Sequence, residues 1–291
     1  MKWFSKSFFL LPLAGLISSC TYTFYPASCE YPTARYLKKV STIPDSVYET
    51  SGIAAKNGKF ISFNDSGGEA ALYFFSGNSD EIQKSRILNS TNVDWESMAY
   101  DGDNFYIADV GNNFGRRDTL TIYKIPSGPL PGETQSELAE RITFSYLEEA
   151  SHTASGWYSN DCEAIFWYND SLYLFSKDWV NLNTRVYVLP DQPGHYDLAP
   201  RVSYEVDALI TGADVFIPGN EVVLVGYRKY VPILIRYSFE SDPSMITGGG
   251  KARKYPARIG AQTEGVCFDD AGRIFVTSEK TFRKQALYRA Y

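Results

Sequence analysis

The sequence predicts an all-β fold, because strand-like runs dominate the chain from about residue 36 onward. Each run is rich in β-branched or aromatic residues and is bounded by Gly, Asn, Asp or Ser, which is typical of strands separated by turns. Examples are FISFND, NFYIADV, SLYLFSK, EVVLVGY and RIFVTSE. Only residues 133–142 (ETQSELAERI) have a helical pattern, and we expect a helix or a loop insertion there.

One unit recurs five times along the chain. The copies begin at Ser51, Glu96, Glu163, Ala213 and Glu264, so successive copies start 45, 67, 50 and 51 residues apart. Each copy has a short apolar strand, a turn rich in Gly, Asn and Asp, a second and more apolar strand, and a third strand that carries a tyrosine. A repeat of about 50 residues with several strands predicts a β-propeller.

Five copies predict five blades. The last copy ends after its third strand, so its fourth strand must come from elsewhere. Residues 34–44 (ARYLKKVSTIP) precede the first copy and have no repeat of their own. We expect them to pair as the outer strand of the last blade and to close the ring. A six-bladed ring is the alternative, if residues 127–158 contain a degenerate blade.

The first twenty residues have the pattern of a secretory signal. Lys2 and Lys6 precede an apolar run from Phe8 to Ile17, and small residues lead to Cys20. The ending ISSC resembles a bacterial lipobox, which makes Cys20 the expected lipidation site. The alternatives are a soluble secreted protein cut nearby and an uncleaved anchor, although the apolar run is shorter than the about 20 residues that span a bilayer.

These signals divide the chain into a signal peptide (1–20), a tether (21–35) and a single propeller domain (36–291). We therefore expect a protein of the cell envelope, anchored by lipid outside the cytoplasm, at the outer membrane facing the periplasm or at the surface. Without the signal, 26 basic residues face 34 acidic ones, a net charge of −8. This charge disfavours nucleic acid as a partner. The expected partners are the membrane, through Cys20, and an unidentified protein, glycan or small molecule.

Cysteine usage excludes a disulfide scaffold. If Cys20 carries lipid, only Cys29, Cys162 and Cys267 remain, so at most one disulfide can form within the chain. Cys162 and Cys267 lie inside apolar strand patterns, and we expect them to be buried free thiols.

Carboxylates interrupt the first strand of three copies. Glu96 lies in VDWESMAY (93–100), Glu163 in NDCEAIF (160–166) and Glu264 in QTEGVCFDD (262–270). Burial of a charge is costly unless something pairs with it. Because the first strand of each propeller blade lines the central channel, these carboxylates can instead converge at one channel mouth. Ser51 and Ala213 hold the corresponding places in blades one and four.

Oxygen-bearing side chains surround these glutamates in the sequence, notably in NDSGG (64–68) and DVGNNFGRR (109–117). Oxygen ligands prefer calcium or magnesium over zinc or copper, and variable spacing suits calcium. The candidate metal ligands are Glu96, Glu163, Glu264, Asp65, Asp109 and Asp161. The candidate ligand-binding residues are Asn112, Asn160, Arg116, Arg117 and Lys177. The alternative is a water-filled mouth in which backbone amides bind each carboxylate.

The repeated start of a glutamate followed by a small and an apolar residue, in DWESMA, NDCEAI and TEGVCF, resembles the SdiA-regulated and phytase-like (esterase-like) propeller families. The resemblance covers about residues 44–291. It implies a calcium-associated extracytoplasmic propeller, in a group whose members mostly lack an established activity. Only Glu96, Glu163 and Glu264 match the glutamate of the motif. Ser51 and Ala213 depart from it, so a fully symmetric carboxylate ring is not expected.

Two classes of function remain open, beside a structural role with no site. The first is a binding or scaffolding protein that uses aromatic loop residues, for which Trp95, Trp157, Tyr158, Trp167 and Trp179 are available. The second is a metal-dependent hydrolase of a lactone, ester or phosphate ester that uses the same channel carboxylates. A zinc site is excluded because only His152 and His195 are present. No G-x-S-x-G motif supports a serine hydrolase.

Overall fold

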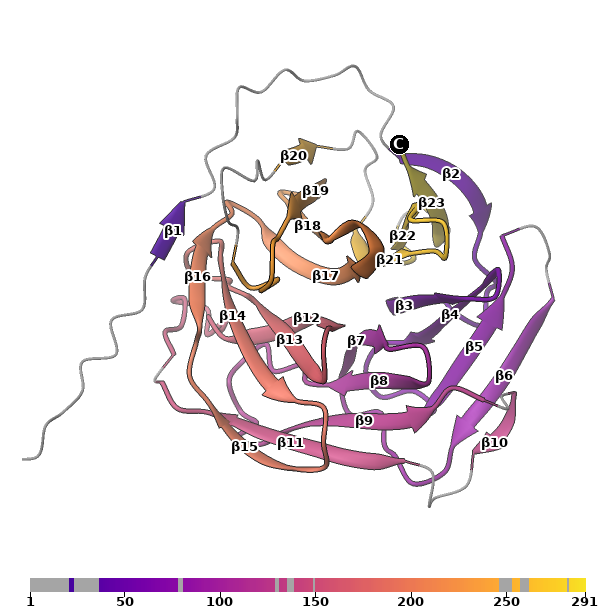
Figure 1. Ribbon diagram of the computed structural model, residues 1–291, viewed down its shortest axis with the longest axis horizontal. Helices are drawn as coiled ribbons and strands as arrows, with labels where there is room; N and C mark the ends of the chain where they lie inside the picture. Colours follow the sequence, from indigo (N-terminus) through magenta and orange to yellow (C-terminus); the bar gives the residue numbers. More distant parts are fainter. Residues whose placement is uncertain are drawn as a thin grey trace, which may run out of the picture.

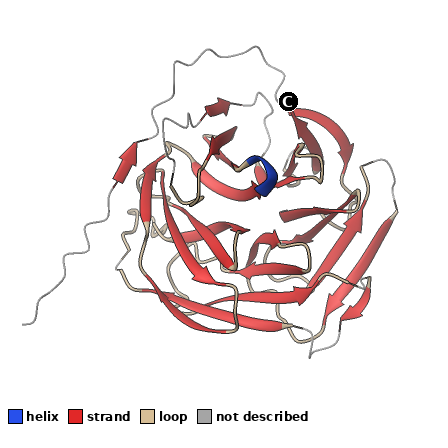
Figure 2. Ribbon diagram, in the orientation of Figure 1, coloured by secondary structure: helices blue, strands red, loops and turns tan. Residues whose placement is uncertain are grey.

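The computed structural model is a five-bladed β-propeller, in which five sheets surround a central channel (Figures 1 and 2). It describes residues 21–23, 37–77, 81–128, 131–134, 139–148, 150–245, 253–256, 262–281 and 283–291. Both the all-β class and the number of blades that the sequence predicts are confirmed.

Each blade is an antiparallel sheet whose first strand lies innermost. Blade one has β3 (Thr50–Lys56), β4 (Lys59–Asn64), β5 (Ala71–Phe75) and β6 (Ile82–Ile87). Blade two has β7 (Trp95–Tyr100), β8 (Asn104–Asp109), β9 (Leu120–Pro126) and β11 (Glu140–Tyr146). Blade three has β12 (Asp161–Trp167), β13 (Ser171–Lys177), β14 (Asn183–Pro190) and β16 (Val202–Glu205). Blade four has β17 (Leu209–Phe216), β18 (Glu221–Arg228), β19 (Val231–Ser238) and β20 (Arg253–Pro256), and a short 3-10 turn, η2 (Ile217–Gly219), follows β17.

The N-terminal strand closes the ring. Blade five contains β21 (Thr263–Phe268), β22 (Ile274–Ser278) and β23 (Ala286–Ala290), and β2 (Leu37–Thr42) pairs antiparallel with β23 as its outer strand. Gln285 Nε2 donates to the carbonyl oxygens of Ile43 (3.1 Å) and Pro44 (3.2 Å), which fastens the two ends of the fold together. The predicted closure is confirmed.

The innermost strands β3, β7, β12, β17 and β21 form a continuous ring, in which each contacts the next and β21 contacts β3. The apolar core lies between neighbouring sheets. One cluster joins Tyr106 and Ile122 of blade two to Ile165 and Leu174 of blade three, and equivalent clusters fill the other blade interfaces. The channel is therefore lined by the starts of the inner strands, where the sequence places its carboxylates.

The helix expected at residues 133–142 is wrong for the part that the structure describes. Thr134 ends β10 (Gly132–Thr134) and Glu140 begins β11, while residues 135–138 lie outside the described ranges. β10 pairs parallel with β6 of blade one, and β15 (Gly194–Leu198) pairs parallel with β11 of blade two. Within residues 127–158, β10 extends blade one and β11 belongs to blade two, so the described part of this region contains no sixth blade.

The remaining expectations concern the N-terminal segment and the thiols. Within the expected tether, β1 (Thr21–Thr23) pairs parallel with β16 at the outer edge of blade three. Cys162 and Cys267 are buried and free, as predicted. Cys20 and Cys29 lie outside the described residues. In the part of the chain that the structure describes, no helix is long and apolar enough to cross a membrane.

Candidate functional site

A β-bulge near the start of each inner strand turns one side chain toward the channel. The register shifts between Trp95 and Ser97, and between Cys162 and Ala164, so that Glu96 and Glu163 are the extra residues. The equivalent shifts in the other blades include Ser51, Thr211 and Glu264. A bulge bends its strand and re-aims a side chain. This explains how a glutamate can stand among apolar strand residues without entering the core between blades.

The register corrects the sequence alignment in blade four. Thr211, and not Ala213, holds the place of the glutamate, and its Oγ1 donates to the carbonyl oxygen of Thr263 (2.8 Å). Ala213 is buried in the apolar core. Asp214 accepts a hydrogen bond at Oδ2 from the backbone N–H of Phe268 (2.7 Å), so it ties blade four to blade five.

Two further sets of equivalent positions lie beside the bulges, and some members of each set line the channel. The first lies two residues before each bulge: Glu49, Asp94, Asp161, Leu209 and Gln262. The second set lies at the end of the second strand of each blade. Each member comes one residue after the second-strand residue that pairs with the last inner-strand residue before the bulge: Asp65, Val110, Lys177, Tyr227 and Glu279. The recurring pattern of a polar residue two positions before the bulge, in DWE, DCE and QTE, was the available signal for the first set.

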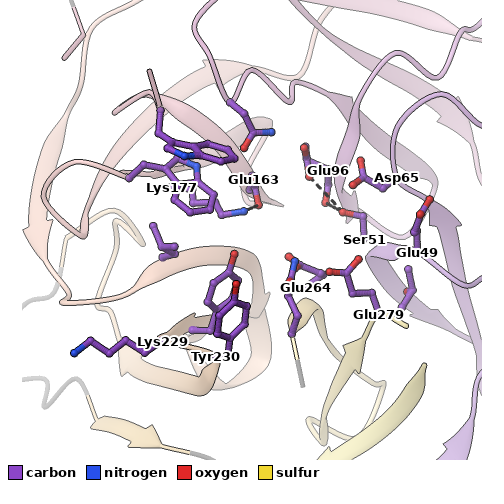
Figure 3. Close-up of a pocket in the computed structure, with 17 residues that line it drawn as sticks. Glu49, Ser51, Asp65, Glu96, Glu163, Lys177, Lys229, Tyr230, Glu264 and Glu279 are labelled. Atoms are coloured by element: carbon purple, nitrogen blue, oxygen red, sulfur yellow. Dashed lines mark hydrogen bonds and ion pairs between the residues drawn. The ribbon is translucent and has the colours of Figure 1, made fainter. Parts of the chain in front are cut away.

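Members of both sets, together with the glutamates at the bulges, line a cavity of about 490 Å³ at the channel mouth (Figure 3). Its lining includes six carboxylates: Glu49, Asp65, Glu96, Glu163, Glu264 and Glu279. It also includes two lysines and four aromatic residues: Lys177, Lys229, Trp157, Trp179, Tyr227 and Tyr230. Figure 3 shows the labelled lysines and Tyr230 on one side and Glu49, Asp65 and Glu96 on the other. The cavity therefore has an acidic wall and an aromatic wall.

Three carboxylates converge at the acidic wall, of which Asp65 and Glu96 line the cavity and Asp94 does not. Oxygen atoms of Asp65, Asp94 and Glu96 all lie within 4.8 Å of one another. Burial raises the pKa of all three groups, and neighbouring carboxylates add to the shift for Glu96 and for Asp65, whose pKa rises to about 7. Gly111 packs against this group, since a Cβ atom there would overlap Asp94 and Glu96. The backbone is shaped to leave room for the carboxylates.

Glu163 has an internal partner. Lys177 Nζ donates to Glu163 Oε2 (2.6 Å), and both side chains are buried. Burial lowers the pKa of Lys177, but Glu163, Tyr227, Glu264 and Asp161 together outweigh burial and raise it, so the lysine is a fixed ammonium group. Lys177 Nζ also lies 4.7 Å from the ring centre of Trp179 and 5.7 Å from that of Tyr227. The Lys177–Glu163 ion pair joins the two walls of the cavity, and Lys177 supplies the positive charge that balances the buried Glu163 carboxylate.

Asn160 and Asp161, the first residues of NDCEAIF, do not line the cavity but support residues around it. The Oδ1 atom of Asp161 accepts from the backbone N–H of Asn112 (2.8 Å), and its Oδ2 atom accepts from Trp179 Nε1 (3.2 Å). Asn160 donates through Nδ2 to Glu148 Oε1 (3.0 Å), behind the cavity. Asp161 therefore orients Trp179, and Asn160 does not reach the cavity.

The loop after β8 is held by four of the predicted site residues. Arg117 Nη2 donates to Asp109 Oδ1 (2.9 Å), and Asp109 also accepts at Oδ1 from the backbone N–H of Asp94 (3.1 Å). Asn112 Oδ1 accepts from the backbone N–H groups of Arg116 (2.7 Å) and Arg117 (3.0 Å). Burial raises the pKa of Asp109, and Arg117 opposes the shift. None of these four lines the cavity; they position Asp94 and Gly111.

Two of the tryptophans form the aromatic wall. The rings of Trp157 and Trp179 stack with centres 4.4 Å apart, and Phe114 stacks on Trp157 at 5.0 Å. Trp95 is buried in the core, and the Nε1 atom of Trp167 donates to Asp191 (2.8 Å).

The sequence matches no protein-family model and no curated protein. The resemblance to the SdiA-regulated and phytase-like families therefore stays an expectation.

Comparison with solved structures shows the fold. A glutaminyl cyclase from Myxococcus xanthus has a TM-score of 0.52 at 15% identity, covering 89% of this chain and 95% of that chain. A PQQ-bound aldose sugar dehydrogenase from Streptomyces coelicolor has a TM-score of 0.49 at 12% identity, covering 89% and 99%. The calcium-binding protein regucalcin from Agrobacterium tumefaciens has a TM-score of 0.47 at 13% identity, covering 93% and 94%. These proteins are β-propellers. At these identities the likeness shows the fold alone.

Proposed function

We propose that this protein is a lipid-anchored propeller of the cell envelope that binds a divalent cation of the calcium class at its channel mouth. It acts as a binding or scaffolding protein for a partner that enters the adjoining cavity. The observation that carries the cation proposal is the convergence of Asp65, Asp94 and Glu96. The basic and apolar start of the chain, ending at Cys20, supports the anchor.

The chemistry of the site favours a hard cation. Its donors are carboxylate oxygens, and neither His152 nor His195 belongs to the cavity lining. Three converging carboxylates repel one another, and a divalent cation relieves that repulsion. Calcium accepts six to eight oxygen ligands in flexible geometry, so it suits a site assembled from two blades better than magnesium does. Asp65, Asp94 and Glu96 would hold the ion, while Lys177 already neutralises Glu163.

Calorimetric titration of chelator-treated protein with calcium tests this proposal. We expect heat of binding and a melting temperature that rises with calcium concentration, because the folded state alone holds the ion. Asp94→Asn should weaken calcium affinity at least about tenfold, equal to about 1.4 kcal/mol. Asp270→Asn, an exposed carboxylate in the β21–β22 turn, is the matched control and should bind as the wild type. No binding heat, together with a melting temperature that chelator leaves unchanged, would reject the proposal.

A metal-dependent hydrolase is the second candidate. The cavity is large enough for a small ester or lactone, and its buried carboxyl groups have raised pKa values, which suits general acids at neutral pH. Turnover of p-nitrophenyl acetate, p-nitrophenyl phosphate or γ-butyrolactone that requires calcium and is lost in Asp94→Asn would establish it. Rates equal to those of buffer for all three substrates would leave the binding role.

A further inference from the structure

The opposite end of the acidic wall contains a carboxylate oxygen without a partner. Glu264 is 7% exposed and lines the cavity, yet no described residue forms a hydrogen bond with its Oε1 atom. Burial raises the pKa of Glu264 well above its usual value, and Lys177 opposes the shift without bonding to Oε1. A buried acceptor that lacks a donor destabilises the fold. Its retention at the cavity wall is accounted for if a ligand supplies the donor.

The spacing around Glu264 does not suit a second metal ion. Among the residues that the structure describes, only Asp65, Asp94 and Glu96 bring three carboxylate oxygens within 4.8 Å of one another. Glu264 and Glu279 are both described and line the same cavity, but they belong to no such group. An ammonium group reaches each acceptor through an N–H bond and carries three donors, so it tolerates wider spacing.

Aromatic side chains stand across the cavity from these carboxylates. Figure 3 shows Tyr230 opposite Glu264 and Glu279. The ring of Tyr230 stacks on that of Tyr227, with centres 6.2 Å apart and planes 3° from parallel. Tyr230 is 70% exposed, so one side of this pair is open to a ligand. Aromatic faces attract organic cations, and the ring or chain of an amine can pack against them.

The backbone at Tyr230 points to a role for its side chain. Lys229 and Tyr230 form the two-residue turn between β18 and β19, with φ of 48° and 61°. Such turns favour Asn and Gly, because a Cβ is strained at positive φ. The two-residue turns of blades one and three follow this preference, with Asn57–Gly58 and Asn169–Asp170. The β18–β19 turn, which joins a second to a third strand rather than a first to a second, has Lys and Tyr at these positions, and both line the cavity.

We infer that Glu264, Glu279 and Tyr230 form a second subsite, which binds the ammonium group of a small organic amine. The carboxylates accept its N–H donors, and the tyrosine pair packs against its carbon frame. This inference deepens the proposed function by naming the class of small molecule that enters the cavity beside the cation. The volume of about 490 Å³ suits a small molecule rather than a folded partner.

Calorimetry with two matched probes tests the inference. The first probe, 2-phenylethylamine, is charged at neutral pH, and the second, 2-phenylethanol, has nearly the same shape without the charge. We expect the wild-type protein to bind the amine at least about tenfold more tightly than the alcohol. Equal affinity for the two probes, or no binding of the amine at about 10 mM, which corresponds to less than about 3 kcal/mol, would overturn the inference.

Two variants locate the subsite, and calcium separates it from the cation site. Glu264→Gln and Tyr230→Gly should each weaken binding of the amine, the first by about tenfold or more, and leave calcium affinity unchanged. Tyr230→Gly is exposed and relieves a positive φ, so it should remain folded. Glu140→Gln, an exposed carboxylate on β11, is the control. Amine affinity that survives both variants would overturn the inference and leave the cation proposal intact. Loss of calcium binding in Asp94→Asn with amine binding retained confirms two separate subsites.

Discussion

Glu96 faces the channel because its strand carries one extra residue at that point. Glu163 and Glu264 also lie in β-bulges, which direct their carboxylates toward the channel instead of into the apolar core. Once there, the three glutamates have different roles. Glu96 joins an acidic triad, Glu163 pairs with Lys177, and Glu264 keeps an oxygen without a partner. Position in the ring and the neighbours supplied by each blade therefore decide the chemistry of each carboxylate.

Gly111 offers a test of the triad that leaves its carboxylates in place. A Cβ atom at this position would overlap Asp94 and Glu96. We expect Gly111→Ala to push the triad apart, to weaken calcium affinity about tenfold or more, and to lower the free energy of unfolding by about 1–3 kcal/mol. Gly128→Ala is the control, since nothing lies within 4 Å of a Cβ there. Calcium affinity equal to that of the wild type would show that the triad is not the cation site.

The repeated glutamates could be predicted from the sequence because their spacing recurs, but their partners could not. Asp94 precedes Glu96 by two residues in VDWESMAY, but the sequence does not reveal which strand residues pair across a blade. The alignment of blade four slipped by two residues, to Ala213 instead of Thr211, because the bulge hides the true register. Tyr230 gave no signal, because its turn lacks the Asn and Gly that identify such turns.

At the scale of the elements, side-chain hydrogen bonds join neighbouring blades. Asp191 follows β14 of blade three and accepts at Oδ2 from Tyr106 OH of blade two (2.9 Å) and from Trp167 Nε1 (2.8 Å). In residues 133–142, strand pairing overrides the helix propensity of the local sequence. It contains good helix formers, yet β11 forms because it pairs with both β9 and β15.

Asp191 predicts a pH dependence of stability. Burial alone would raise the pKa of Asp191, but the hydrogen bonds from Trp167, Tyr106 and Gln192 and the charge of Lys124 together outweigh burial and hold the pKa below its usual value. The folded state therefore favours the charged carboxylate, so its stabilisation is present above about pH 4 and is lost as the pH falls through the folded pKa.

We expect Asp191→Asn to lower the free energy of unfolding by about 1 kcal/mol at neutral pH, and the difference to shrink toward zero in strong acid. Urea unfolding of both proteins across this pH range measures it, with the exposed Asp103→Asn as the control. A difference that stays constant with pH would show that the charge of Asp191 is not the cause.

For the whole molecule, the ring is held closed by a strand from outside the repeats. β2 pairs with β23, and Ile43 and Val47 are buried beside it in the core of the first and last blades. The sequence predicted this closure because the last copy lacks a fourth strand and residues 34–44 belong to no copy.

Two truncations test the closure. A variant that lacks residues 1–33 loses β1 at one outer edge but keeps β2, so we expect it to melt cooperatively. A variant that lacks residues 1–44 also loses β2 and Ile43, so we expect no cooperative melting, as followed by circular dichroism. Equal stability of the two variants would contradict the closing role of β2.

The central claim is that Asp65, Asp94 and Glu96 bind the cation at the channel mouth, while Glu163 stays paired with Lys177. The most direct measurement is a crystal structure of the calcium-loaded protein. We predict anomalous density among these three carboxylates, with metal–oxygen distances of about 2.3–2.6 Å, and an unchanged contact between Lys177 and Glu163. A calcium ion bound to Glu163 in place of Lys177, or a calcium-loaded crystal without anomalous density at Asp65, Asp94 and Glu96, would contradict the claim.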